Sequence, residues 1–261
     1  MIDLQEQFGR DGFVQIPGAL SAGEIARLNR AFEQDFEGCA GDWVHFGDSF
    51  IETVDVLART EAFDFTIDNP AVMPLVNDIL GGEVSFEEFS MILRKPVREA
   101  ADHKAWHRDI VRDFSRRMEI NAVSLIYYLT DVTGNDHCFS IIPGTHGPLV
   151  DMRPEDVRPG MEVDLVAPAG TALLFHARAI HAGKLKPESA ERRTIHIYYS
   201  RTDLPRTSEW SSFPERLRGR PLFAKWNRTD VIDGTGRKPK DLDPSLPSAV
   251  LLREVQRRAN R

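Results

Sequence analysis

The feature that most constrains this chain is a series of short β-rich runs between residues 84 and 200. The runs are VSFEEFSMILR, NAVSLIYYLT, CFSII, VDLVA, TALLFH and TIHIYYS, and loops rich in glycine, proline and aspartate separate them. Such runs are typical of strands. Successive strands without helices between them favour an antiparallel sandwich or barrel over a parallel α/β sheet. In the last run alternate residues face opposite sides, so Ile195 and Ile197 point away from Thr194 and His196. We therefore expect a mainly β fold with flanking α-helices.

Two helices are predicted before this β-rich region. Residues 21–37 begin with a capping box, in which Ser21 is followed three residues later by Glu24. Residues 70–80 follow Asn69 as the N-cap, with a proline in the first helical position and two glycines at the end. These local signals predict both ends of each helix.

The whole chain, residues 1–261, is expected to form a single domain. Its parts are an N-terminal helical support (1–83), a β core (84–200) and a C-terminal covering segment (201–261). A last helix is predicted from about Ser248. Loops as long as residues 201–242 are usually functional or disordered, and a lid, a dimer contact and plain packing remain alternatives for that segment.

Composition narrows the class of protein. The chain has 41% hydrophobic and 28% charged residues, which is ordinary for a soluble globular protein. No apolar run approaches the ~18–20 residues that span a bilayer, and charges near the start replace the apolar stretch of a signal peptide. Cys39 and Cys138 are too few for a disulfide scaffold. The net charge of −7 does not favour nucleic acid. We expect a cytoplasmic monomer or homodimer that binds a small-molecule substrate, without a nucleic-acid or membrane partner.

A candidate metal site follows from one short motif and one distant histidine. AWHRDI contains His107 and Asp109, which face the same side if the segment is extended. By itself this pair is equally well explained as a surface ion pair. TALLFHARAIHAG adds two candidates for a second imidazole, His176 and His181, near the end of an apolar strand. Two histidines and one carboxylate form the facial triad of non-haem Fe(II) oxygenases. Arg192 and Arg193 begin the next strand, and the planar fork of arginine suits the far carboxylate of a 2-oxo acid.

At these motifs the chain resembles the phytanoyl-CoA dioxygenase family of Fe(II)/2-oxoglutarate oxygenases, over most of residues 5–200. The segments that carry the resemblance are GFVQIPGALSAGEIARL, ILRKP before WHRD, YYLTDVTGNDHCFSIIPGTH and LLFHARAIHAGKLKPESAERR. The resemblance implies a double-stranded β-helix (jelly roll, cupin-like) core. It also implies Fe(II) as the cofactor, with 2-oxoglutarate and O2 as co-substrates, and oxidation of a substrate C–H bond with release of succinate and CO2.

The resemblance also assigns residues. His107, Asp109 and His181 are implied as the catalytic metal ligands, and Arg192 as the partner of the distal carboxylate of 2-oxoglutarate. Arg193 is the alternative by register, because only one of the two can face the cavity.

One departure from the family concerns the residues after the distal histidine. The family often has Gly-Ser there, whereas this chain has Ala182 and Gly183. Thr194 is a candidate substitute for the missing serine hydroxyl, because it lies two residues past Arg192 on the same strand face.

Further contacts are predicted around this site. Met91 and Lys95 are expected near the co-substrate, and Tyr127, with Tyr128 as the alternative by register, near the substrate. Basic residues around the metal motif indicate an anionic substrate if they line the cavity mouth: Arg94 and Arg112, which we select for substrate binding, and Arg98, Arg116 and Arg117. Pairing with the acidic first third of the chain explains the same arginines equally well.

The remaining histidines are expected to have structural roles. His176 falls on the strand face opposite His181, and His146 is expected to stabilise the PGTH turn. His45, His103 and His196 are expected at the surface or in an ordinary core.

Two other functional classes compete with the oxygenase. One is a family member that binds metal or a 2-oxo acid without turnover, as a sensor; the other is a cupin-like enzyme that uses the metal without 2-oxoglutarate. A complete set of His107, Asp109, His181 and Arg192 argues against both classes. Release of succinate would separate the oxygenase from either of them.

Overall fold

The computed structural model describes residues 3–54, 56–81, 84–97, 105–109, 122–147, 149–187, 189–201, 214–217 and 220. Several predictions lie outside these ranges: Arg98, His103, Arg112, Arg116, Arg117, the helix from Ser248 and nearly all of the segment 201–242. Within the described ranges, no helix combines the length and the apolar character needed to cross a membrane.

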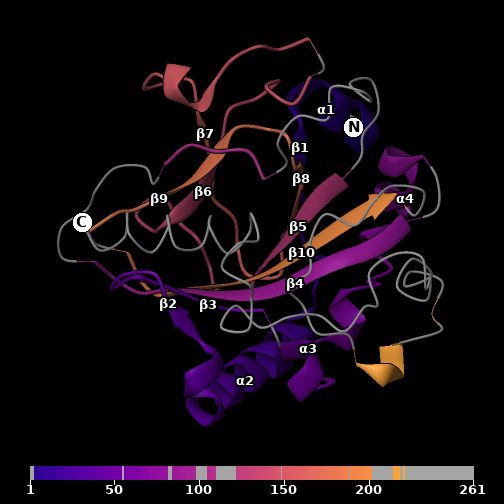
Figure 1. The fold of residues 1–261 in the computed structure, drawn as a ribbon, viewed down its shortest axis with the longest axis vertical. Coiled ribbons are helices and arrows are strands. Elements are labelled where there is room, and N and C mark those ends of the chain that lie inside the picture. The colour runs from indigo at the N-terminus through magenta and orange to yellow at the C-terminus, as the bar shows by residue number, and fades with distance from the viewer. Residues whose placement is uncertain are drawn as a thin grey trace, which may run out of the picture.

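In the described part of the chain, ten strands form two antiparallel sheets (Figure 1). The strands are β1 (Phe13–Ile16), β2 (Val44–His45), β3 (Phe50–Thr53), β4 (Val84–Arg94), β5 (Ala122–Tyr128), β6 (Cys138–Ile141), β7 (Val163–Leu165), β8 (Ala172–His176), β9 (His181–Lys184) and β10 (Arg192–Arg201). The larger sheet has the order β1-β8-β5-β10-β4-β3-β2, and the smaller has the order β7-β6-β9. All their pairings are antiparallel. The expected fold class, a mainly β jelly roll with flanking helices, is confirmed.

The helices lie around the larger sheet. They are α1 (Leu4–Asp11), α2 (Ala22–Gly38), α3 (Val56–Arg59) and α4 (Met73–Leu80). Helices α2 and α3 lie on the side of this sheet that faces away from β6, β7 and β9 (Figure 1). The capping box of α2 is confirmed, since Glu24 N donates to Ser21 Oγ at 3.3 Å and Ser21 N donates to Glu24 Oε2 at 2.8 Å.

Helix α4 ends as predicted but begins later. Gly81, at φ 62°, terminates the helix in the left-handed conformation. The predicted start at residue 70 is wrong, because the helix begins at Met73. Asn69 instead caps a turn: its Oδ1 accepts a hydrogen bond from Ala71 N at 2.8 Å, and its carbonyl accepts one from Met73 N. An asparagine side chain accepts the same kind of backbone hydrogen bond in a turn and at the start of a helix. The presence of Asn69 in the sequence therefore could not distinguish the two structures.

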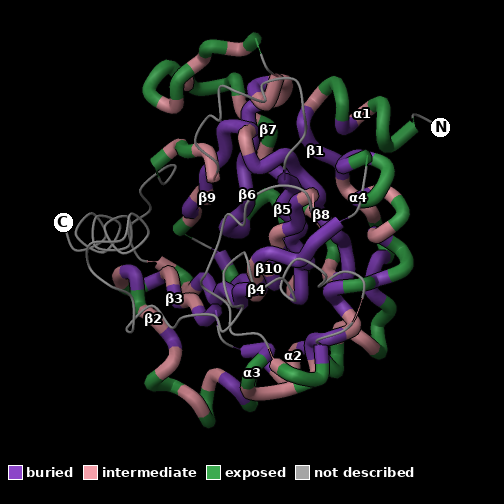
Figure 2. The backbone as a smooth tube through the Cα atoms, turned by 45° about the vertical axis from the view of Figure 1, so that its right-hand side comes forward, coloured by how far each residue is buried: buried purple, intermediate pink, exposed green. Residues whose placement is uncertain are grey.

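Two cores occupy the two faces of the larger sheet. The outer core packs strand residues such as Leu125 against Leu28 and Phe32 of α2. The inner core lies between the sheets and includes Tyr128 and Phe139. Figure 2 shows the buried stretches running along β4, β5, β8 and β10. Because side chains alternate along each strand, every residue of these strands belongs to one face or the other.

Candidate active site

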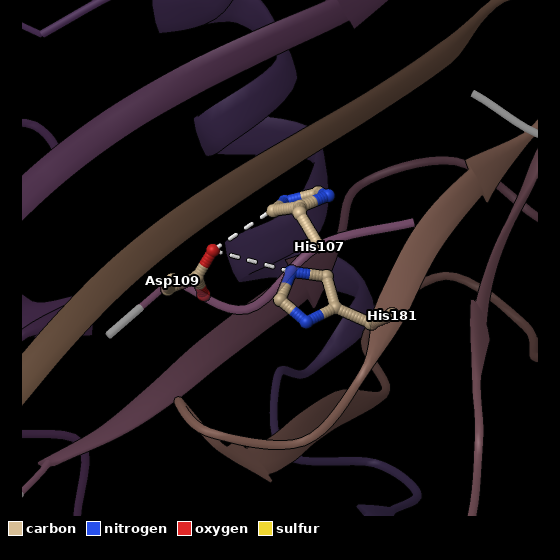
Figure 3. A group of neighbouring side chains, drawn as sticks. All are labelled: His107, Asp109 and His181. Carbon is tan, nitrogen blue, oxygen red and sulfur yellow. Dashed lines mark ion pairs between the residues drawn. The ribbon is translucent and has the colours of Figure 1, made fainter. Parts of the chain in front are cut away.

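His107, Asp109 and His181 converge through backbone pairing rather than through proximity in the sequence. His107 and His181 form an isolated antiparallel bridge in which each N–H donates to the other's carbonyl at 3.0 Å. Asp109 N donates to Ala177 O, also at 3.0 Å. The His-x-Asp segment therefore lies alongside β9. The three side chains each place one ligand atom within 4.8 Å of the others (Figure 3).

Backbone carbonyls orient both imidazoles. Nδ1 of His107 lies 3.0 Å from Ala105 O, and Nδ1 of His181 lies 3.0 Å from Ala179 O. A carbonyl only accepts, so each Nδ1 carries the hydrogen and each Nε2 is left as the ligand atom. Both Nε2 atoms face Asp109 Oδ1, at 3.5 Å from His107 and 3.2 Å from His181 (Figure 3).

The charges in the triad stabilise an ionised carboxylate. Burial disfavours the charged form of Asp109, but the charge of His181 and hydrogen bonds from both imidazoles outweigh it, so the pKa of Asp109 lies well below its usual range. Partial desolvation also disfavours the charged form of His107, but its hydrogen bond with Asp109 and the charge of Asp109 outweigh it, so the pKa of His107 is raised. Two imidazole nitrogens and one carboxylate oxygen are the donor set of a non-haem Fe(II) centre, so the residues present fit that metal.

The two imidazoles differ in how closely they are packed. The His181 ring packs against two phenylalanines, with centroid distances of 5.0 Å to Phe139 and 4.9 Å to Phe175. Its side chain is 5% exposed, whereas that of His107 is 53% exposed. The aromatic contacts restrain His181, and His107 is the more exposed of the two imidazoles.

Arg192 and Arg193 point to opposite faces of β10. Arg193 pairs outside with Glu33 at 2.8 Å and Glu191 at 2.7 Å. Arg192 is 6% exposed and faces the space between the sheets, where its Nη1 donates to His137 O at 3.2 Å. Its Nε has no hydrogen-bond partner within the described residues. Of the two register alternatives, Arg192 is therefore the inward one.

Arg94 lies directly beside Arg192 on the neighbouring strand. The two residues are register partners across β4 and β10. The Arg94 guanidinium lies 4.0 Å above the Phe50 ring, and its Nη1 is buried without a partner in the described part of the chain. Burial and the charge of Arg192 lower the pKa of Arg94 to about 9, against an opposing effect of Glu52. Buried charges are normally paired, so two adjacent guanidinium groups favour an anion between the sheets.

Gly183 makes room for Arg94. A Cβ at this position of β9 would lie 3.3 Å from Arg94 Nη2. The glycine thus lets the long side chain of β4 cross the space to the smaller sheet. Gly183 is one of the two residues after the distal histidine that differ from the Gly-Ser often found in the family, and this contact gives a steric reason for a glycine there.

Comparisons with known proteins agree with this geometry. The sequence profile of the family described as Phytanoyl-CoA dioxygenase (PhyH) matches residues 8–193. The chain belongs to this family. Membership confirms the class expected from the sequence, a 2-oxoglutarate-dependent non-haem iron oxygenase.

Three similar proteins share less than a quarter of their aligned residues with this phytanoyl-CoA dioxygenase family member. L-proline trans-4-hydroxylase of Streptomyces griseoviridis is 24% identical, and the match covers 77% of this chain and 87% of that protein. The fold resembles the 2-oxoglutarate-dependent epimerase SnoN of nogalamycin biosynthesis, with a TM-score of 0.63, 21% identity, and 76% of this chain and 80% of that one covered. It also resembles HygX of Streptomyces hygroscopicus, solved with nickel, 2-oxoglutarate and hygromycin B, with a TM-score of 0.63, 18% identity, and 84% and 94% covered.

Three predicted contacts of this family member are wrong, each because the side chain lies on the outer face. Tyr127 packs in the outer core, where its hydroxyl donates to Thr66 O at 3.2 Å. Met91 is buried in the same core. Lys95 places its Nζ 5.4 Å from the ring centroid of Phe36 on α2. None of these side chains faces the space between the sheets.

Tyr128, the register alternative to Tyr127, lies on the inner face. Its hydroxyl donates to Leu165 O at 3.1 Å. Thr194 also faces inward, with its Oγ1 3.0 Å from Nε2 of His196. Its contact with the co-substrate stays a prediction.

Two inward residues were not singled out from the sequence. His196 was expected at the surface or in an ordinary core, yet it lies on the face that carries Thr194 and Arg192, and burial lowers its pKa to about 3. The alternation in TIHIYYS already placed it there. Glu52 faces inward from β3, and burial raises its pKa to about 7, with opposing effects of Ser90 and Arg94. Its strand is only four residues long, too short for alternation alone to reveal its face.

The other described histidines lie outside the triad. His176 is buried against Phe8, and its Nδ1 accepts a hydrogen bond from Arg178 N at 3.1 Å. His146 connects the PGTH turn to α1, with Nε2 at 3.2 Å from Gly9 O. Both lie away from the ligands, as expected. His45 is exposed on β2.

Proposed function

We propose that His107, Asp109 and His181 bind Fe(II), and that the protein oxidises a C–H bond of a small organic substrate. The co-substrates are 2-oxoglutarate and O2, and the products include succinate and CO2. The observation that carries this proposal is the convergence of two oriented Nε2 atoms on one carboxylate oxygen. When bound, Fe(II) would supply open coordination positions for the 2-oxo acid and O2, together with the redox chemistry of the oxidation.

The inner face of β10 would bind the co-substrate. Its inward residues run from Tyr198, beside Asp109, through His196 and Thr194 to Arg192. A 2-oxo acid whose reactive end lies at the triad would thus direct its other end toward Arg192. A buried guanidinium with an unpartnered Nε suits that distal carboxylate.

Neighbouring groups of this chain support the same assignment. Arg94 adds a second positive charge at the Arg192 end, which strengthens its preference for a carboxylate. The low pKa of His196 keeps its imidazole neutral beside Thr194, so it supplies a hydrogen bond rather than a competing charge. Phe139 and Phe175 cover the His181 ring and keep water from that side.

A small-molecule substrate is supported by what the related proteins are named for. These include an L-proline hydroxylase and a structure holding hygromycin B. Contact of Arg94 with an anionic substrate group stays a prediction, and the predicted substrate residue Arg112 lies outside the described ranges.

An anaerobic titration tests the proposal. Metal-free protein receives Fe(II) and then 2-oxoglutarate, and the visible iron-to-oxo-acid charge-transfer band is followed. We expect the band in the wild type, its loss in His107→Ala, and its retention in His45→Ala, which removes an exposed histidine far from the triad. Iron binding without any band would refute the oxygenase in favour of a cupin-like enzyme. A band without succinate release, across a panel of amino acids and aminoglycosides in the presence of O2, would favour the sensor.

A further inference from the structure

One hydrogen bond at the triad comes from a residue that is not one of the three proposed metal ligands. Tyr198, on the inner face of β10, donates from its hydroxyl to Asp109 Oδ2 at 3.0 Å. The other carboxylate oxygen, Oδ1, is the one that faces both imidazoles. The two oxygens of Asp109 therefore have separate partners, and a phenol is protonated at neutral pH and donates this bond.

The neighbouring strand β4 is locally irregular opposite this tyrosine. The register between β10 and β4 shifts between Tyr198 and Tyr199. The extra residue at this shift is Glu87 of β4, whereas β10 stays in regular register with β5. Such irregularities are frequent beside active sites. Tyr199, on the opposite face, instead donates to Ile67 O at 2.6 Å in the outer core.

We propose that Tyr198 is a positioning residue that holds Asp109 as a one-oxygen metal ligand. This inference rests on the proposed function. A carboxylate can bind a metal through one oxygen or through both. Rotation of Asp109 would bring Oδ2 onto the metal and occupy a position that the co-substrate needs. With Oδ2 engaged by Tyr198, only Oδ1 is directed at the centre shared by His107 and His181.

Tyr198 also restrains Asp109, the carboxylate ligand, through a hydrogen bond. His181 is fixed by Phe139 and Phe175, and both imidazoles are fixed by carbonyls at Nδ1. Outer hydrogen bonds to metal ligands typically change metal affinity by about 10- to 100-fold when removed. The same magnitude is expected for this phenol.

The test compares Tyr198→Phe with Tyr199→Phe. Both variants remove one hydrogen-bonded hydroxyl from adjacent residues of the same strand, part-buried in Tyr198 and buried in Tyr199. A purely structural effect is therefore expected to be at least as large for Tyr199→Phe. The readouts are the Kd for Fe(II) under anaerobic conditions and the visible absorption of the Co(II)-substituted protein, which reports coordination number. Thermal denaturation of the metal-free variants measures the common loss of stability.

We expect Tyr198→Phe to weaken Fe(II) binding about 10- to 100-fold and to change the intensity of the Co(II) absorption. Tyr199→Phe should retain wild-type affinity and spectrum while losing at least as much melting temperature. The role is overturned if Tyr198→Phe keeps the wild-type Kd and spectrum, or if both variants lose metal equally. A wild-type protein that binds neither Fe(II) nor Co(II) would instead refute the proposed function, and the positioning role with it.

Discussion

Replacing Arg192 by glutamine tests the co-substrate site most directly. The guanidinium is 6% exposed, and its Nε has no partner within the described residues. In Arg192→Gln, the distal carboxylate of 2-oxoglutarate would be buried without its main cation. Removing one partner of a buried, hydrogen-bonded charge pair costs about 2–5 kcal/mol. Arg94 remains on the adjacent strand, so we expect the lower part of this range, about 2–3.5 kcal/mol. This corresponds to a rise of about 30- to 300-fold in the Kd for 2-oxoglutarate.

Arg193→Gln is the matched control for this prediction. Arg193 pairs with Glu33 and Glu191 on the outside of the same strand, and surface ion pairs contribute only about 0–1 kcal/mol. The assay is the anaerobic charge-transfer titration at saturating Fe(II), with iron affinity measured separately to confirm an intact triad. The reasoning is refuted if Arg192→Gln binds 2-oxoglutarate within threefold of the wild type, or if Arg193→Gln weakens binding as strongly.

Two further predictions concern stability. The pKa of Glu52 is raised from 4.5 to about 7 in the folded protein, so native protein keeps a proton that the unfolded chain releases, and wild-type stability falls as pH rises through this range. Metal-free Glu52→Gln should therefore match the wild type at pH 4 and exceed it by up to about 3 kcal/mol at pH 8; urea denaturation showing no gain at pH 8 would contradict this. Gly170 has φ +87°, and a Cβ there would lie 2.6 Å from Leu20 O, so Gly170→Ala should lose about 2–4 kcal/mol of unfolding free energy. Gly18→Ala, at φ +67° with nothing within 4 Å, should lose only about 1–2 kcal/mol, and equal losses in the two variants would argue against the steric explanation.

Sequence patterns gave correct predictions where the interactions join residues that are close in the sequence. The capping box at Ser21 formed as predicted because its hydrogen bonds join residues three positions apart. The alternation in TIHIYYS placed Thr194 and His196 on one face because side-chain direction in a strand has a period of two. The predicted start of α4 was wrong because Asn69 caps a turn with the same kind of hydrogen bond that an asparagine makes at the start of a helix.

The sequence by itself determined the antiparallel class, the faces of β10 relative to one another, and the chemical types of the candidate ligands. These follow from residue identity, strand period and motif order. They required no knowledge of which strands are neighbours.

Only the tertiary structure decided which face is the inside. A shift of one residue in register would place Tyr128 instead of Tyr127 on the outer face. The helix residues that pack with Tyr127 in the outer core come from a distant part of the chain. The same holds for the pairing of His107 with His181, which brings the triad together, and for Arg94 beside Arg192. Burial and pairing partners are properties of the assembled sheets, because they depend on contacts between segments that no local pattern relates.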